Sequence, residues 1–538
     1  MAKPVRPQNL LLISLALGWI FDFLFWQKAV GISLPIFTFL MVVIGLWMAR
    51  RAGLKPSPGA VWLLAPIAFF SLVPALRLEP FTRLTSIILV FVLLAIFALS
   101  FLGGQWVRYG FMDYIAKILG LVPSGLGLLK ETAGKETNQK GNRFSVRSLA
   151  PVFRGLLFAL PLLWFLAVLL ASADPAFADW LDSIFSFLEI DNAVEYVFRG
   201  FYILILAYGL AGVYMFAFNR SHKQVLLGEE KPIIAPVLGF GESTTMLSSV
   251  NILFAAFVVF QFNYFFGGTT NIVDTPTGFT YSEYAVRGFW ELVAVSLTSL
   301  VFFIALSGIS KRDTASQRRW FSGLGIALFA LAAVILASAF ERLLLYERVY
   351  GFTRLRTYPH VFMIWLGLLL LAIVILEALG RQRAFALATL SAAVGFSATL
   401  SLLNVDAFIV RQNIGLIHAG QQFSVSDPGS GSGKLDYAYL GTLSDDAVPA
   451  LESAYRQSRL DEDSQLTQQL ATTLTCHFKI VNQPGETPWQ SWNRSRQAAL
   501  SSWNFLKADP GFPIIEITEG NTFTFSGEEL SCFGPAWD

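Results

Sequence analysis

The 538-residue chain is 54% hydrophobic and only 14% charged, with a mean hydropathy of +0.57 and a formal net charge of +2. Soluble proteins carry about 25% charged residues, so this composition excludes an ordinary soluble enzyme and predicts a membrane protein. We expect the lipid bilayer to be the main partner and expect no nucleic-acid partner.

Eleven apolar runs follow one another through the first 403 residues, and each is close to the roughly 20 residues that cross a bilayer core. The run at 60–76 is the least regular, because it contains Pro66 and Pro74. The fold class expected is therefore an all-α polytopic membrane protein whose transmembrane domain is 1–403. The runs are 10–26, 30–49, 60–76, 84–102, 152–171, 200–218, 246–266, 288–308, 320–340, 359–379 and 384–403.

The charges of the loops give the expected orientation. Lysine and arginine recur in alternate connections, including the long loop 103–150, and these connections are predicted to be cytoplasmic together with the N-terminus. The loop 172–195, on the other side, has six acidic residues and no basic one. With an odd number of spans, residues 404–538 are predicted to lie outside the cytoplasm.

Residues 404–538 are expected to form a small, mainly helical α+β domain. They contain 16 acidic and 8 basic residues, which suits an extracytoplasmic location. Helical patterns cover most of this segment, and 514–520 with 521–527 alternates like a β-hairpin. Both cysteines, Cys476 and Cys532, lie here, and an oxidising compartment favours a disulfide between them, although two unrelated buried thiols would also fit the sequence.

One heptapeptide occurs twice, as EYVFRGF at 195–201 and EYAVRGF at 283–289. Each copy closes a loop on the outer side and opens an apolar run in the same direction, which predicts tandem helical-hairpin repeats arranged in parallel. Glutamate and arginine four residues apart share one helix face, so Glu195 with Arg199 and Glu283 with Arg287 are expected to form ion pairs.

The second copy adds Glu291, about one turn inside the apolar run. A charge within a membrane is costly, so this carboxylate should face an arginine, another helix or a wet cavity. Two interpretations stay open, namely a site that binds a ligand or handles protons, and a structural ion pair that locks helices together.

The third outer loop, 341–360, is unusually rich in arginine. Its charged candidates are Glu341, Arg342, Arg348, Arg354 and Arg356. The arginines require compensation, for which Glu283, Glu291, the acidic loop or an anionic lipid or solute are the candidates. An internal lattice of salt bridges is the alternative to a bound anion.

Asp22, near the outer end of the first run, is the remaining candidate. It could serve an enzyme that acts on lipid-linked substrates with a metal, but its loop supplies no second carboxylate. A partner for Lys28 or for an outer arginine is the simpler interpretation. The four histidines lack metal-ligand spacing, and no nucleophile or zinc motif occurs, so we predict no catalytic residue, no metal and no cofactor.

Four segments are similar in sequence and order to a known family: YSEYAVRGFWEL (281–292), YGFTRLRTYPHVFMIWLG (350–367), NVDAFIVRQNI (404–414) and LDYAYLGTLSDDAVPAL (435–451). The chain from about 10 to 455 resembles a bacterial family of multi-pass membrane proteins known only as a domain of unknown function. That resemblance implies a bacterial inner-membrane location and no established activity.

Three functions remain open at this point. The first is a non-enzymatic protein that binds a ligand or a protein partner through its outer polar cluster and C-terminal domain, in sensing, envelope maintenance or assembly. The second is a transporter of a small anionic or lipid-like solute, which predicts a cavity lined by Glu291 and by Asn251 or Gln261. The third is an enzyme on lipid-linked substrates.

Overall fold

The computed structural model describes most of the chain in two compact units. The described residues are 7–137, 193–222, 226–227, 236–266, 289–419, 437–481, 487–512, 522–525 and 528–531, with a few positions between 166 and 180. Unit 1 is Met1–Ala68, Phe91–Trp106 and Tyr114–Gln224, and unit 2 is Phe69–Val90, Val107–Asp113 and Val225–Asp538. The predicted boundary at residue 403 falls inside unit 2.

Nine helical segments in the described ranges are long and apolar enough to cross a membrane. They are Ser33–Arg51, Pro58–Leu76, Pro80–Ser100, Glu195–Asn219, Phe240–Gln261, Phe289–Ile309, Ala315–Arg348, Arg354–Ala378 and Ala384–Leu403. Each overlaps a predicted run, which confirms a multi-pass helical membrane protein. The first run is the shorter apolar helix α1 (Pro7–Phe25), and 152–171 lies mostly outside the described residues, so the count of eleven stays a prediction.

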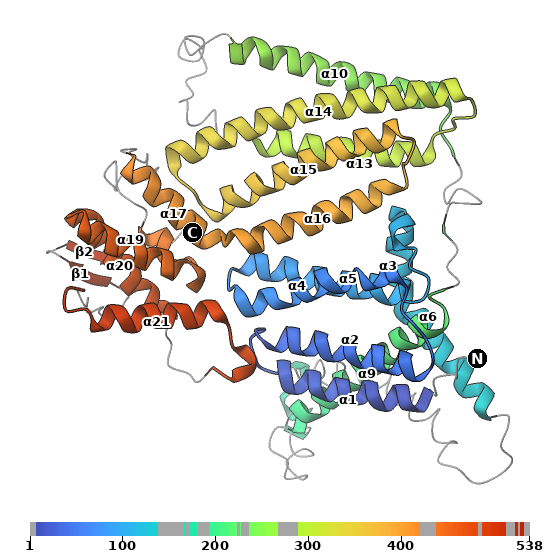
Figure 1. The fold of residues 1–538 in the computed structure, drawn as a ribbon, viewed down its shortest axis with the longest axis horizontal. Helices are drawn as coiled ribbons and strands as arrows, with labels where there is room; N and C mark the ends of the chain where they lie inside the picture. Colours follow the sequence, from blue (N-terminus) through green and yellow to red (C-terminus); the bar gives the residue numbers. More distant parts are fainter. Residues whose placement is uncertain are drawn as a thin grey trace. The chain divides into compact units, whose positions relative to one another are not determined.

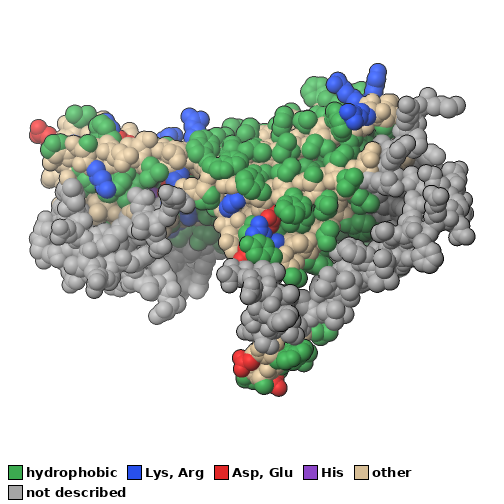
Figure 2. All heavy atoms as spheres, turned by 90° about the horizontal axis from the view of Figure 1, so that it is seen from below, with side chains coloured by type: hydrophobic (Ala, Val, Ile, Leu, Met, Phe, Trp, Pro, Cys, Tyr) green, Lys and Arg blue, Asp and Glu red, His purple; other side chains and the backbone are tan. Residues whose placement is uncertain are grey.

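Large apolar side chains are exposed on these helices, as lipid contact requires. Trp62, Ile252 and Val301 are 78%, 70% and 59% exposed. On the face drawn in Figure 2, hydrophobic side chains form a broad surface, and arginine and lysine side chains gather at a few places along its margin.

In unit 1, α1 packs against α2 (Ser33–Arg51) and along α9 (Ala193–Asn219). Gly18 makes the contact with α9 close, since a Cβ there would lie 2.9 Å from the backbone oxygen of Ile203. Gly45 on α2 likewise faces the ring of Tyr214, whose hydroxyl donates to the Met41 carbonyl at 2.8 Å. Small residues at such crossings let membrane helices approach each other.

Unit 2 is built around α14 (Ala315–Tyr350), which packs against α10 (Phe240–Phe266), α13 (Phe289–Ile309) and α15 (Arg354–Ala378) (Figure 1). A capping box of Thr314 and Gln317 starts α14, and Gly351 at φ 74° ends it so that α15 can return. Helix α16 (Ala384–Leu403) packs next to α15, and the ring of Trp365 lies against Gly395, where a Cβ would leave no room for it.

The C-terminal helices share a hydrophobic core with the ends of α15 and α16. Asn404, at φ 54°, turns the chain from α16 into α17 (Val405–His418), and the amide side-chain oxygen of Asn404 caps the new helix. The following elements are α18 (Tyr437–Gly441), η3 (Asp445–Ala447), α19 (Val448–Leu460), α20 (Ser464–Val481), η4 (Trp489–Ser491) and α21 (Arg494–Ala508). Buried Leu451, Tyr455 and Leu470 hold these helices against α17.

The hairpin near the C-terminus differs from the predicted one. The described strands are β1 (Thr522–Phe525) and β2 (Glu528–Ser531), paired antiparallel. The segment predicted as the first strand, 514–520, lies outside the described residues, and the pairing uses the segment that follows 522–525 instead.

Two further spans lie between α2 and the long loop. The span Pro58–Leu76 consists of α3 (Pro58–Val61) and α4 (Leu64–Leu76), and the next span is α5 (Pro80–Ser100). After α5 come η1 (Trp106–Arg108) and α6 (Phe111–Thr137). Of these, α6 lies where the cytoplasmic loop 103–150 is predicted.

Candidate functional site

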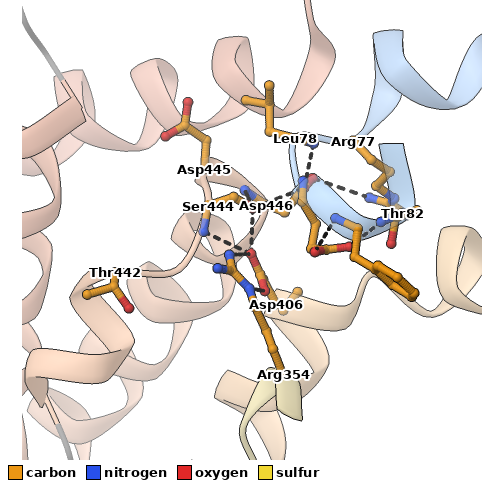
Figure 3. A network of polar contacts seen from close by, with 12 residues as sticks. Arg77, Leu78, Thr82, Arg354, Asp406, Thr442, Ser444, Asp445 and Asp446 are labelled. Carbon is orange, nitrogen blue, oxygen red and sulfur yellow. Dashed lines mark hydrogen bonds and ion pairs between the residues drawn. The ribbon is translucent and has the colours of Figure 1, made fainter. Parts of the chain in front are cut away.

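Polar residues from five segments of unit 2 meet in one buried network (Figure 3). We call this network the Asp406 cluster. Three of its segments belong to the motifs noted in the sequence, namely the start of α15, the start of α17 and the turn before and into η3. The fourth is the connection between α4 and α5, and the fifth is the start of α21. The members of the cluster are Glu79, Arg354, Tyr358, Asp406, Ser444, Asp446 and Ser495.

The centre of the Asp406 cluster is a fork of two parallel bonds. Arg354 donates from Nε to Asp406 Oδ1 at 2.8 Å and from its terminal nitrogen to Oδ2 at 2.5 Å. Asp406 is fully buried and belongs to the first turn of α17, where a negative charge is favoured by the helix dipole. A two-bond arginine–carboxylate pair fixes both side chains in distance and in angle.

Ser444 links this pair to the C-terminal helices. Its backbone N–H and its hydroxyl donate to Asp406 Oδ2 at 2.8 and 2.6 Å. The hydroxyl oxygen also lies 3.1 Å from Asp446 Oδ2, and Tyr439 accepts the backbone N–H of Arg354 at 2.7 Å. Burial raises the pKa of Tyr439 to about 12, so its hydroxyl is neutral at physiological pH.

Asp446 extends the network to the connection between α4 and α5. Its Oδ2 accepts the backbone N–H groups of Leu78 and Glu79 at 2.7 and 2.8 Å, and its Oδ1 accepts the hydroxyl of Ser495. Burial raises the pKa of Asp446, and these three hydrogen bonds act in the opposite direction because they favour the carboxylate. Arg77 contributes a longer ion pair at 4.0 Å.

Glu79 closes the network at the start of α5. Its carboxylate caps that helix by accepting the backbone N–H groups of Phe81 and Thr82 at 2.8 and 2.7 Å, and it also accepts the hydroxyl of Tyr358 on α15. Next to it, Asn493 donates to the carbonyls of Pro74 and Arg77 at 2.7 and 3.1 Å. The loop 74–79 is thus held from α15, η3 and α21 together.

The carboxylates of the Asp406 cluster are buried and hydrogen-bonded to other protein groups. Asp406, Asp446 and Glu79 are 0%, 2% and 2% exposed, and each accepts hydrogen bonds from protein donors. Asp445 points away from the network in Figure 3 and bonds His477 Nε2 at 3.0 Å, in the interior of the C-terminal helices. Within the described ranges, no three His, Cys, Asp or Glu side chains are grouped so as to hold a metal. The arrangement can fix segments in place but offers no free group to a substrate.

A second arginine–aspartate fork lies in unit 1. Arg199 on α9 donates to the two oxygens of Asp22 on α1 at 3.0 and 2.5 Å, and the hydroxyl of Tyr202 donates to the same carboxylate. Glu195 lies 3.6 Å from Arg199 and accepts the indole N–H of Trp26 at 2.7 Å. A second carboxylate therefore lies near Asp22, as the enzyme interpretation requires, but Arg199 forms ion pairs with both carboxylates.

The other predicted site residues are spread over different surroundings. Arg356 donates to the carbonyls of Tyr350 and Gly351 at 2.7 and 2.6 Å, and so caps the end of α14. Glu291 is exposed in the first turn of α13. Glu341 and Arg348 are exposed on α14 and Arg342 is half-buried; Glu283, Arg287 and Cys532 lie outside the described residues, while Cys476 is buried in α20.

Two of the outer arginines have other partners than the glutamates earlier in the chain that the sequence suggested. Arg354 pairs with Asp406, and Arg356 bonds backbone carbonyls; neither Asp406 nor Asp446 nor Glu79 was among the candidates. The signal for two of them was present, because Asp406 and Asp446 stand inside two of the motifs. Glu79 is an acid between two apolar runs, a position where a helix cap is common.

A cavity with a volume of about 670 Å³ lies along α14 between α10 and α15. Gln261 lines it, but Glu291 does not, and Asn251 instead donates to the Leu324 carbonyl at 3.0 Å. The transport interpretation predicts a cavity lined by Glu291, which this cavity does not match.

One family model matches the part of the chain that contains every member of the Asp406 cluster except Ser495. It matches residues 64–454 and is described as a domain of unknown function, DUF4153. The chain belongs to the DUF4153 family. No curated protein and no solved structure matches the sequence. The C-terminal helices α20 and α21 and the β-hairpin lie beyond the matched region of this DUF4153 protein.

Proposed function

We propose that this DUF4153 protein is a non-enzymatic platform of the bacterial inner membrane. Its C-terminal α+β domain would lie outside the cytoplasm, with the N-terminus and loop 103–150 on the cytoplasmic side. There the domain would bind a ligand or protein partner in sensing, envelope maintenance or assembly. The full architecture would be eleven spans with tandem hairpin repeats and a Cys476–Cys532 disulfide.

The observation that carries the proposal is that the carboxylates of the Asp406 cluster are buried and bonded to protein groups. The motif residues are used to hold the C-terminal helices on the loop 74–79 and on the starts of α15 and α17, and their carboxylates have protein partners. Three buried carboxylates are expensive to retain unless each is fully hydrogen-bonded. A rigid attachment of this kind suits a domain that must be presented in one orientation to a partner.

The test replaces the ion pair of Arg354 and Asp406 with apolar side chains of similar volume. A buried ion pair can often be exchanged for apolar side chains of similar volume at little cost, whereas removal of one partner costs about 3–5 kcal/mol. We therefore expect Asp406→Ala to abolish cellular function and Arg354→Met with Asp406→Leu to restore part of it, because no buried arginine is left unpaired although Ser444 still loses its acceptor. The measurement is growth under envelope stress of cells that lack their own copy, with membrane protein levels quantified in parallel.

Two outcomes would count against the platform. If the double apolar variant is present at normal level but inactive, the arginine and the carboxylate act on a ligand or substrate and do not only hold the C-terminal helices in place. If Asp406→Ala is fully active, the attachment is not needed for function. Asp22→Asn is the matched control in the other unit, and we expect it to remain active.

Transport of a small anionic or lipid-like solute and catalysis on lipid-linked substrates are the alternatives. Transport has the cavity at Gln261 in its favour but lacks Glu291 as a lining residue. Catalysis has Glu195 near Asp22 in its favour, yet Arg199 lies between them and no described group is placed to hold a metal. An anionic lipid or solute at the exposed Arg348 is compatible with either alternative.

A further inference from the structure

The cavity along α14 combines an apolar channel with two buried polar atoms. Gln261 Nε2 and Ser338 Oγ are almost fully covered, belong to residues that line the cavity, and have no hydrogen-bond partner among the described residues. The two residues are 7% and 9% exposed. A buried donor left unpaired costs about 1–3 kcal/mol, so such atoms ordinarily mark an unseen ligand or water.

Three polar side chains follow one another along the cavity. The starts of α10 and α14 lie together, since the Lys311 N–H donates to the Leu238 carbonyl at 2.9 Å, and Asn251 on α10 donates to the Leu324 carbonyl on α14. Gln261 is therefore level with about Val334, and Ser338 and Glu341 lie about one and two turns further toward the turn into α15.

The rest of the cavity lining is apolar. It is formed by side chains such as Ala333, Val334, Leu368 and Leu371. Leu371 is eight residues further along α15 than Met363, another lining residue, which corresponds to about 12 Å along the helix. Figure 1 shows the three helices of the cavity side by side, with α14 between α10 and α15.

We propose that this cavity binds one phospholipid with an ammonium headgroup. The acyl chain would lie along Ala333, Val334 and Leu371, the ester or phosphate oxygens would accept from Gln261 and Ser338, and the ammonium would meet the exposed carboxylate of Glu341. The volume of about 670 Å³ falls within the roughly 300–1,000 Å³ usual for small-molecule sites. Glu341 makes no ion pair with another described residue, and its charge favours a cationic headgroup over an anionic one.

The experiment measures lipid retention by the purified full chain in detergent, by native mass spectrometry. The probes are phosphatidylethanolamine and phosphatidylglycerol with identical acyl chains. We expect one retained phosphatidylethanolamine at a concentration about tenfold below that needed for phosphatidylglycerol, and loss of this preference in Glu341→Gln. Equal retention, or preference for phosphatidylglycerol, would overturn the proposal.

Two variants test the location of the lipid. Ala337 is exposed and lines the cavity, so Ala337→Trp should fill it and weaken retention about tenfold or more. Ala327 is also exposed on α14 but does not line the cavity, so Ala327→Trp is the matched control and should retain lipid normally. Equal retention by both variants would contradict the site.

Gln261→Leu separates a ligand contact from a folding effect. Removal of an unpaired buried amide should keep or raise the unfolding temperature, and lipid retention should fall about fivefold or more. Unchanged retention by this variant would overturn the proposed contacts. A dimer that Ala337→Trp dissociates would mean that a second copy of the chain, and not a lipid, fills the cavity.

Discussion

The two arginine–aspartate forks of this protein have nearly the same geometry but different surroundings. Arg199 and Asp22 join two helices, α1 and α9, and their side chains are 27% and 7% exposed. Arg354 and Asp406 are similarly paired and similarly covered, at 24% and 0%, but Asp406 also bonds Ser444, which leads on to Asp446. The same chemical pair therefore joins two helices in one case and five chain segments in the other.

This difference indicates that connectivity, more than the fork itself, decides what a covered ion pair contributes. An exposed pair contributes about 0–1 kcal/mol, whereas breaking a buried one costs about 3–5 kcal/mol. The comparison can be tested by removing equivalent groups from each fork and from a fully exposed pair.

The largest effect is expected for Asp406→Ala. The variant leaves Arg354 without its partner and removes the acceptor of Ser444, so the free energy of unfolding should fall by about 3–5 kcal/mol. Denaturant titration of the purified protein in detergent measures it. A loss below about 1 kcal/mol would mean that this fork contributes no more to stability than an exposed ion pair, which would contradict the prediction.

A smaller and more local effect is expected for Asp446→Asn. The amide oxygen can still accept the N–H groups of Leu78 and Glu79, but it is neutral, and the amide nitrogen replaces the oxygen that accepts Ser495. Part of the about 1.5–3 kcal/mol that each hydrogen bond to a charged acceptor contributes should therefore be lost. The same titration measures the loss. Asp445→Asn is the neighbouring control, because Asp445 bonds His477 and not the loop 74–79.

The fork of unit 1 should be less sensitive. Asp22→Asn keeps one acceptor for Arg199 and for Tyr202, which both belong to α9, so we expect a loss of about 1–2 kcal/mol. Thermal unfolding in detergent compares it with Asp406→Asn. Equal losses from the two variants would remove the distinction drawn between the forks.

The smallest effect is expected at the exposed pair of Arg459 and Asp509. The Gly511 N–H, followed by Arg459, lowers the pKa of Asp509, so its contribution to stability is present above pH 3.8 and is lost as the pH falls through the lowered value. Asp509→Asn should therefore be slightly less stable than the native chain at pH 7. Unfolding midpoints of both proteins down to pH 3 should converge, and a difference that grows in acid would contradict this sign.

The sequence predicted the helices well because lipid imposes a length and a composition on each span. Runs such as 359–379 and 384–403 correspond closely to α15 and α16. Asp22 was expected to have an outer arginine or Lys28 as partner, and Arg199 occupies that place.

The Asp406 cluster could not be predicted from the sequence in the same way. Arg354 and Asp406 are 52 residues apart and Leu78 and Asp446 are 368 apart, and no local pattern encodes such contacts. Charge spacing drew attention to the loop 341–360 but assigned its arginines to glutamates that precede it. The contacts depend on the turn at Asn404, which the sequence did not reveal.

Hydrogen exchange of the full chain in lipid nanodiscs tests the attachment most directly. If the Asp406 cluster holds the C-terminal helices in place, Asp406→Ala should speed exchange in 437–512 and in 76–79. Asp22→Ala should speed exchange only in α1 and α9. Unchanged protection of 437–512 in Asp406→Ala would contradict the account.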